Sequence, residues 1–118
     1  MKPGEVRIIG GEWKRSKLPL PRGVELRPTP DRVRETLFNW LGQDLTGWRC
    51  LDAFAGTGAL GFEAASRGAA SVLLCDSQAS CIEAMAKSQD KLGAMGKEGP
   101  VQKMVVKVTI NLDNRPKN

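Results

Sequence analysis

Two aspartates and a run of glycines are the residues of this chain whose types and spacing suit chemistry. In the stretch LDAFAGTGALG, Asp52 precedes the glycines at 56, 58 and 61, and Asp76 lies 20 residues after Gly56. Glycines at a turn from strand to helix let the backbone approach a ligand, and an acid at about that distance suits ribose hydroxyls. The pattern predicts a nucleoside-type ligand. The alternative is that the glycines only permit tight packing.

Asp52 bears on which nucleoside derivative fits the turn. A dinucleotide places its pyrophosphate at the N-terminus of the following helix, where a carboxylate repels it. S-adenosyl-L-methionine carries no phosphate, and its cationic sulfonium and its amino group favour a nearby carboxylate. Asp52 therefore favours S-adenosyl-L-methionine over NAD, with a turn-capping role as the alternative. A P-loop is excluded because no Gly-Lys-Ser/Thr follows the glycines.

The pattern around the glycines predicts the elements that position them. Residues 49–54 and 71–76 form short apolar strands, each followed by a helix, at 59–67 and at 78–96. Continuous apolar strands alternating with helices predict a doubly wound α/β fold, a parallel sheet covered on both faces. With a last strand at 104–112 this sheet falls short of the usual number of about five strands. We therefore expect low stability, or self-association through an uncovered sheet edge.

The segment before the glycine turn has a different character. VRIIGGEWKRSKL predicts two short strands around a tight Gly10-Gly11 turn, and PLPRGVELRPTP an extended connector. Thr29 is expected to cap a helix over 30–42 that has Pro30 at its first position. Along this helix apolar residues recur at helical spacing: Val33, Leu37, Trp40 and Leu41. We expect a basic hairpin and connector at 1–28 and an α/β domain at 29–118.

Composition limits the classes of function. The 118 residues are 41% hydrophobic and 26% charged, which fits one soluble domain. The chain has no histidine, and its three cysteines never form Cys-x-x-Cys, so we expect neither a metal site nor a disulfide framework. No segment has the length of a membrane span, and the N-terminus lacks a secretory signal, so a cytoplasmic location is expected.

Positive charge gathers near the N-terminus. The net charge is +5, and residues 1–35 hold nine basic side chains against five acidic ones. Arg7, Lys14, Arg15 and Lys17 suit phosphate contacts, and Trp13 among them offers a stacking surface for a base. The alternatives are a solvated charged surface and a tryptophan packed beneath the hairpin.

Four stretches together resemble a known family. VRIIGGEWKRSKL, LRPTPDRVRETLFNWL, LDAFAGTGALGFEAASRGA and VLLCD, in this order and spacing, resemble bacterial small-subunit rRNA guanine-N2 methyltransferases of the RsmD type over roughly residues 5–92. The resemblance implies the N-terminal half of a Rossmann-like class I methyltransferase fold, preceded by a β-hairpin. It further implies S-adenosyl-L-methionine as methyl donor and, as acceptor, a guanine of 16S rRNA in the assembling small ribosomal subunit.

The resemblance also assigns site residues. It implies that the glycine turn and the two acids hold the cofactor through Asp52, Ala55, Gly56, Thr57, Gly58, Asp76 and Ser77. It places Arg27, Thr29 and Arg34 beside the cofactor and rRNA pockets. The alternatives are helix capping for Thr29 and a solvated face for the two arginines.

The motif with which such families present the acceptor is not among the 118 residues. It has the form Asn/Asp-Pro-Pro-aromatic, and none of the seven prolines adjoins another. Its polar groups orient the amine, and its ring stacks on the flipped base. The similarity ends soon after Leu92. Two functions are therefore expected: the family's methyl transfer, completed by another chain, or a truncated cofactor- or RNA-binding fragment without turnover.

Overall fold

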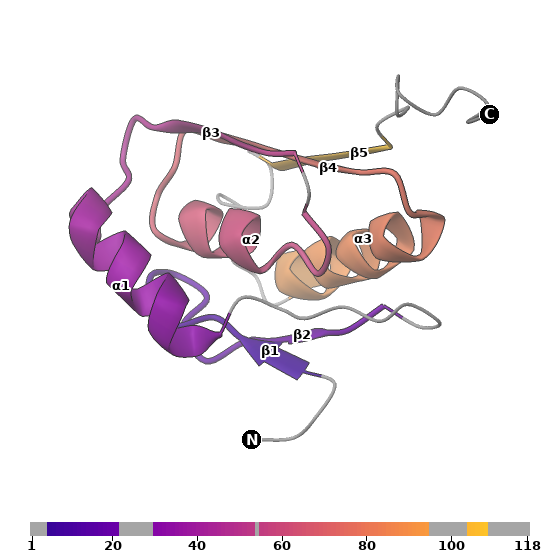
Figure 1. Ribbon diagram of the computed structural model, residues 1–118, viewed down its shortest axis with the longest axis horizontal. Helices are drawn as coiled ribbons and strands as arrows, with labels where there is room; N and C mark the ends of the chain where they lie inside the picture. The colour runs from indigo at the N-terminus through magenta and orange to yellow at the C-terminus, as the bar shows by residue number, and fades with distance from the viewer. Residues whose placement is uncertain (1–4, 22–29, 54, 95–103, 109–118) are drawn as a thin grey trace, which may run out of the picture.

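Helices α2 and α3 lie between a three-stranded parallel sheet and an antiparallel pair of strands (Figure 1). The computed structural model describes residues 5–21, 30–53, 55–94 and 104–108. In chain order the elements are β1 (Glu5–Arg7), β2 (Lys17–Pro19), α1 (Asp31–Leu41), β3 (Arg49–Asp52), α2 (Ala59–Ser66), β4 (Ser71–Asp76), α3 (Ala79–Ala94) and β5 (Met104–Val108). The expected α/β class is therefore confirmed.

The parallel sheet has the strand order β3-β4-β5. Its register pairs Asp52 with Leu74 and Asp76 with Val108, so the carboxyl ends of the strands meet at one edge of the sheet. Helix α2 packs directly on β4, because a Cβ atom at Gly61 would lie only 2.0 Å from Leu74 Cδ2. This close approach explains the third glycine of the stretch as a packing residue.

Both crossover helices lie on one face of this sheet (Figure 1). The prediction of a sheet covered on both faces is wrong for the part of the chain that the structure describes. Strands added in one direction through right-handed crossovers carry their helices to the same face. Leu51, on the opposite face, consequently keeps 66% of its surface exposed.

Strands β1 and β2 pair antiparallel, but not through the predicted tight turn. Arg7 pairs with Lys17, and nine residues separate the two strands. Gly10 and Gly11 lie within this connection, which we call the docking loop (residues 8–16). The loop packs closely against α2: a Cβ atom at Gly11 would lie 1.9 Å from the carbonyl oxygen of Ser66.

Helix α1 departs from its prediction at its start and in its buried side. The helix begins at Asp31, and Pro30 is the N-cap residue, whereas Thr29 lies outside the described residues. Its buried residues are Arg34 and Phe38. Of the four apolar residues at helical spacing, Leu37 and Leu41 are half-buried, and Val33 and Trp40 are 53% and 81% exposed. The apolar spacing does not indicate the buried side of α1, because the central contact on that side is the ion pair of Arg34 and not a hydrophobic contact.

Helix α3 agrees with its predicted apolar side. Met85 and Leu92 are fully buried, and Ile82 and Gln89 are half-buried. One hydrophobic cluster joins residues of the N-terminal segment with those of the α/β part, among them Ile8, Trp13, Phe62 and Leu74. The expected boundary between residues 28 and 29 lies outside the described residues. None of the described helices is long and apolar enough to span a membrane.

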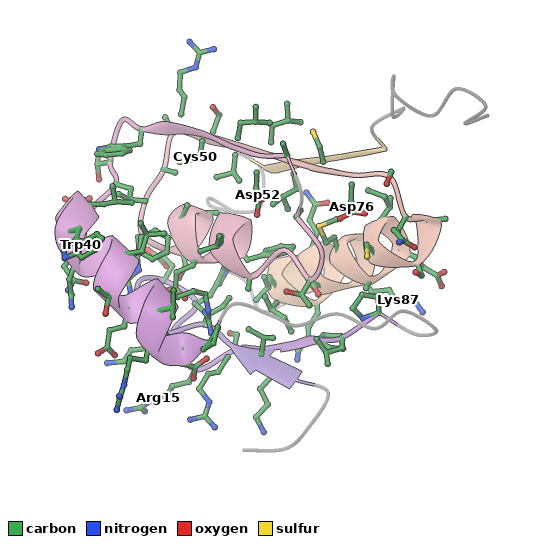
Figure 2. The ribbon with its side chains drawn as sticks, in the orientation of Figure 1. Arg15, Trp40, Cys50, Asp52, Asp76 and Lys87 are labelled. Atoms are coloured by element: carbon green, nitrogen blue, oxygen red, sulfur yellow. The ribbon has the colours of Figure 1, made fainter. Side chains whose placement is uncertain are left out.

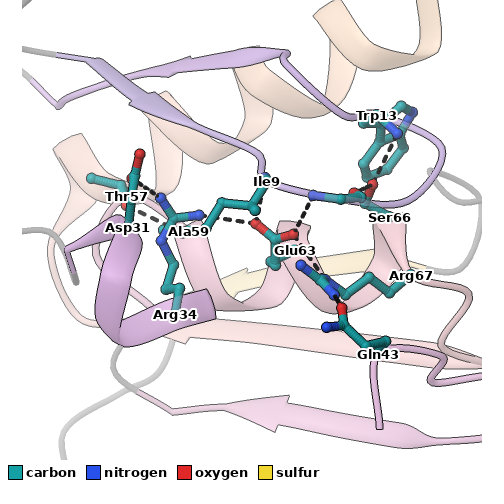
Figure 3. A network of polar contacts seen from close by, with 11 residues as sticks. Ile9, Trp13, Asp31, Arg34, Gln43, Thr57, Ala59, Glu63, Ser66 and Arg67 are labelled. Atoms are coloured by element: carbon teal, nitrogen blue, oxygen red, sulfur yellow. Dashed lines mark hydrogen bonds and ion pairs between the residues drawn. The ribbon is translucent and has the colours of Figure 1, made fainter. Parts of the chain in front are cut away.

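A buried carboxylate on α2 joins α1 to the docking loop (Figure 3). Glu63 Oε1 accepts hydrogen bonds from Ile9 N and Arg34 Nη1, each at 2.9 Å. Glu63 Oε2 accepts from Gly10 N and Arg67 Nε, also at 2.9 Å. The side chains of Glu63 and Arg34 have no exposed surface. Four donors therefore compensate one buried negative charge.

The outer groups of this network extend it to both sides. Arg34 also pairs with Asp31, and Arg67 donates to the side chain of Gln43 while lying 4.8 Å from the centre of the Phe38 ring. One turn further along α2, Ser66 Oγ accepts from Trp13 N at 2.9 Å and donates to Gly10 O at 2.6 Å. The docking loop is thus held along the C-terminal half of α2.

We expect Glu63→Ala to lower the free energy of unfolding by about 3–5 kcal/mol, because it leaves Arg34 buried without its main partner. Urea denaturation followed by circular dichroism measures this change. The matched control is Glu83→Ala, which removes an exposed helical glutamate lying 3.2 Å from Lys87 Nζ and is expected to cost less than about 1 kcal/mol. Equal losses in the two variants would contradict the central role of Glu63.

Candidate functional site

The glycine turn connects the end of β3 to the start of α2 and is fixed by backbone hydrogen bonds. Ala55 N donates to Cys75 O at 2.9 Å, and Gly58 N donates to Ala55 O at 2.7 Å. Gly56 and Gly58 have φ angles of 58° and 84°, which L side chains rarely adopt. The sequence therefore needs glycine at both positions to make this turn.

Asp76 reaches the glycine turn from the carboxyl end of β4 (Figure 2). Its Oδ2 accepts a hydrogen bond from Gly56 N at 2.8 Å, and its Oδ1 accepts from Gln78 N at 2.9 Å. The carboxylate is half-buried. Because a carboxylate offers about four acceptor positions, it keeps capacity for a ligand hydroxyl. The two motifs that lie 20 residues apart in sequence thus meet at one point.

The remaining cofactor candidates lie around this contact. Asp52 ends β3, is half-buried, and lies on the same side of the sheet as Asp76 (Figure 2). Ala55 and Thr57 are buried, and Thr57 Oγ1 accepts a hydrogen bond from Ala59 N at 3.2 Å. Ser77 is exposed next to Asp76. The structure brings these predicted cofactor residues together at the carboxyl edge of the sheet, and Thr29 lies outside the described residues.

Gly58 is explained by packing in addition to its turn geometry. A Cβ atom there would lie 2.6 Å from Phe62 Cε2 and 3.1 Å from Met85 Cγ. For Gly58 and Gly61 the tight-packing interpretation therefore holds. Among the glycines of the stretch, Gly56 is the one whose amide is directed at the aspartate that the sequence pattern predicted as a ligand group.

Cys81 is a neighbour of the site that the sequence analysis did not identify. It lies in the first turn of α3 and is fully buried. Burial raises the pKa of the Cys81 thiol, and the charge of Asp76 and a hydrogen bond to it raise this pKa further. The thiol therefore stays neutral near neutral pH and packs against Asp76 without adding charge. Cysteine count and spacing carry no signal for such a role.

The predicted RNA-binding residues divide into two groups. Four of them are exposed and are called the basic surface below: Arg7 and Lys17, which pair across β1 and β2, and Lys14 and Arg15 in the docking loop. Arg34 is instead fully buried between Glu63 and Asp31, so its guanidinium is not available to phosphates in this structure. Arg27 lies outside the described residues.

Trp13 does not provide a stacking surface. Its side chain is fully buried, and its ring centre lies 6.3 Å from that of Phe62. The alternative of a tryptophan packed beneath the hairpin is therefore correct. Within the described ranges, no three His, Cys, Asp or Glu side chains gather in a way that suits a metal ion.

Comparisons with known proteins agree with this geometry. The sequence profile of the family described as "Conserved hypothetical protein 95" matches residues 6–118, so the similarity does not end soon after Leu92 as expected. The chain is 50% identical over 91 residues to "Ribosomal RNA small subunit methyltransferase D" of Escherichia coli K12, which covers 77% of this chain and 46% of that protein. It is 45% identical over 98 residues to the protein of the same name from Haemophilus influenzae, covering 83% of this chain and 51% of the relative.

A solved structure gives the same relationship in three dimensions. An Escherichia coli protein with a provisional methyltransferase name superposes with a TM-score of 0.75 at 45% sequence identity. The match covers 90% of this chain and 54% of that protein. The chain thus spans about half the length of the curated relatives that it matches.

Two glycine variants distinguish the cost of placing a side chain at a positive φ angle from the cost of a steric clash of its Cβ atom. We expect Gly47→Ala, at φ 88° with no atom within 4 Å of the added Cβ, to cost about 1–2 kcal/mol of stability. Gly58→Ala, at φ 84°, adds the clash with Phe62 and should cost a further 1 kcal/mol or more, by about the penalty of overpacking. Urea denaturation of both variants measures the difference. Equal losses would contradict packing of Gly58 against Phe62.

Proposed function

This chain belongs to the family described as "Conserved hypothetical protein 95", and we propose that it binds S-adenosyl-L-methionine and contributes to methylation of small-subunit rRNA. The names of the relatives support the reaction, and the glycine turn supports the cofactor. The acceptor is the exocyclic N2 of a guanine in 16S rRNA, as the RsmD resemblance implies. The setting is the cytoplasm, on the assembling small ribosomal subunit.

The contact between Asp76 and Gly56 is the observation that carries the cofactor assignment. It places an acceptor at the end of one strand against a backbone amide of the turn that ends the neighbouring strand. This juxtaposition at the carboxyl edge of a parallel sheet suits a nucleoside, with the ribose hydroxyls donating to the carboxylate. A phosphate at the same place is disfavoured by two carboxylates, Asp52 and Asp76.

Each site residue then has a distinct task. Asp76, with Ser77 beside it, holds the ribose and adenosine, and Asp52 lies near the methionine part, where its charge favours the sulfonium and the amino group. Ala55, Gly56, Thr57 and Gly58 line the methionine part, and the resemblance alone adds Thr29 to the site. The bound cofactor supplies an electrophilic methyl group. The residues of this chain bind and orient the cofactor.

The basic surface of Arg7, Lys14, Arg15 and Lys17 is the proposed rRNA contact. These side chains are exposed on β1, β2 and the docking loop, and phosphate contacts of this kind carry affinity with little sequence preference. Arg27 belongs to this proposal by resemblance alone. Arg34 does not, because its pairing with Glu63 makes it a structural residue.

The alternative function is binding of cofactor or RNA without turnover. The Asn/Asp-Pro-Pro-aromatic motif that orients the acceptor amine is not among the 118 residues. Labelled S-adenosyl-L-methionine incubated with 16S rRNA or with assembling small subunits tests the transfer step. Calorimetric titration of the cofactor tests binding separately. Binding without transfer would favour the alternative, and the lack of binding would contradict both functions.

We expect Asp76→Ala to raise the Kd for S-adenosyl-L-methionine at least tenfold, because a hydrogen bond to a charged group is worth about 1.5–3 kcal/mol. Isothermal titration calorimetry measures this change, with Asp90→Ala, an exposed acid of α3, as the control.

A cofactor analogue without a ribose hydroxyl makes this test specific. It should bind the wild-type chain more weakly, but should lose little further affinity for Asp76→Ala, because the two changes remove the same contact. Additive losses would show that Asp76 acts on the turn and not on the ribose.

We expect Lys14→Ala/Arg15→Ala to weaken binding to a 16S rRNA fragment and to reduce the slope of log K against log salt concentration by roughly 1.5, since two phosphate contacts are lost. Fluorescence anisotropy at several salt concentrations measures both quantities. Arg49→Ala/Lys87→Ala is the charge-matched control, with exposed residues on β3 and α3. An equal effect of both double variants would show that the weaker binding comes from the lower net charge of the chain and not from a contact at Lys14 and Arg15.

A further inference from the structure

We propose that Lys91 of α3 is a further phosphate contact for rRNA, so that the RNA backbone passes from β1 and β2 onto α3. This inference deepens the proposed function and rests on it, because it extends the basic surface. Lys91 lies 74 residues after Lys17 in the sequence. The gathering of positive charge near the N-terminus therefore gives no indication of it.

A direct contact joins Lys91 to the basic surface. Lys91 Nζ donates a hydrogen bond to the backbone oxygen of Lys17 at 2.9 Å, and both residues are exposed. α3 and β2 lie next to each other at this contact (Figure 1). An ammonium group has three N–H donors, so two remain for phosphate oxygens. Because the hydrogen bond holds the side chain in place before RNA binds, less entropy is lost on binding.

The charges around this contact have the same sign. Arg7 and Lys17 lie opposite each other in the register of β1 and β2. Both are exposed, whereas their neighbours Val6 and Leu18 are buried, so the two cations share the outer face of the strand pair. Like charges directly opposite each other are destabilising, and Lys91 adds a third cation. A bound polyanion would relieve this repulsion.

The described carboxylates compensate other cations. The ion pairs among the described side chains involve three basic residues: Arg34, Arg67 and Lys87. Lys87 lies one helical turn before Lys91, and its Nζ is 3.2 Å from Glu83 Oε1. Two lysines on neighbouring turns of α3 therefore differ: a carboxylate partly neutralises Lys87, whereas no described carboxylate pairs with Lys91.

The cations follow a path across three elements. β2 contacts both β1, through the pairing of Lys17 with Arg7, and α3, through Lys91. Arg15 lies beside this row, because its N–H donates to the carbonyl oxygen of Ile8, the residue after Arg7, at 2.9 Å. An RNA strand that follows these cations passes from the docking loop over β1 and β2 to α3. The rRNA contact then belongs to both parts of the chain and not to the N-terminal segment alone.

The alternative is a purely structural role for Lys91. It lies in the last turn of α3, where a cation interacts favourably with the helix dipole, and its hydrogen bond joins this helix to β2. The two roles differ in the salt dependence of RNA binding. A phosphate contact releases condensed counterions from RNA, so its loss changes the slope of log K against log salt concentration, whereas the loss of a structural contact leaves that slope unchanged.

Fluorescence anisotropy of the 118-residue chain with a labelled 16S rRNA fragment, at several salt concentrations, tests the inference. Lys91→Gln removes the charge and keeps a side-chain N–H donor. We expect it to reduce the slope by about 0.7–0.9 and to raise the Kd roughly five- to eightfold at about 0.1 M salt, which is the share of one phosphate contact relative to about 1 M salt. Lys91→Arg keeps the charge and should restore the wild-type slope.

Lys87→Gln is the matched control, because Lys87 is exposed on the same helix and already pairs with Glu83. It should leave the slope unchanged. Three results would overturn the inference: an unchanged slope in Lys91→Gln, an equal effect of Lys87→Gln, or a loss of affinity that Lys91→Arg does not restore.

The same measurements distinguish this inference from the proposed function. If Lys14→Ala/Arg15→Ala weakens binding and Lys91→Gln does not, the inference is wrong and the proposed rRNA contact stands. If the wild-type chain does not bind the fragment, both are wrong. None of these measurements uses S-adenosyl-L-methionine, so they are independent of the cofactor assignment.

Discussion

The carboxylate of Glu63 is the interaction on which the arrangement of this chain depends. It lies within α2 without exposed surface and accepts hydrogen bonds from two backbone amides and two guanidinium groups. A buried charge is tolerated only when its partners are all in place, since removing one leaves an uncompensated ion. The docking loop, α1 and the end of α2 must therefore come together in a single geometry, and the hydrophobic contacts of Trp13 and Phe62 form around it.

The same helix connects this network to the proposed cofactor site. Its first residues follow the glycine turn, where Phe62 N donates to Gly58 O and the Phe62 ring fills the space above Gly58. Its last turn holds the docking loop through Ser66. Residues proposed to bind the cofactor and residues proposed to contact rRNA are thus positioned by opposite ends of α2.

Local sequence signals predicted the elements around the site well and their packing partners less well. The strand SVLLCD is β4 with unchanged bounds, and the spacing between Gly56 and Asp76 predicted two groups that the structure places 2.8 Å apart. These features succeed because strand and turn chemistry are local. The apolar spacing on α1 did not indicate that Arg34 is buried, because Arg34 owes its burial to a glutamate 29 residues away, which apolar periodicity does not detect. The sequence left two interpretations of Trp13 open for the same reason, because the side chains that bury Trp13 belong to α2, which lies far away in the sequence.

Helix α2 also sets a distance. It has eight residues, and a rise of 1.5 Å per residue makes it about 12 Å long. The proposed cofactor site and the docking loop are therefore held apart by a rigid spacer of fixed length and fixed rotation. One inserted residue would lengthen it slightly but would turn its far end by roughly 100°, which would separate Glu63 from its donors. The number of residues between the glycine turn and Glu63 thus fixes the distance between the proposed cofactor site and the proposed RNA contact.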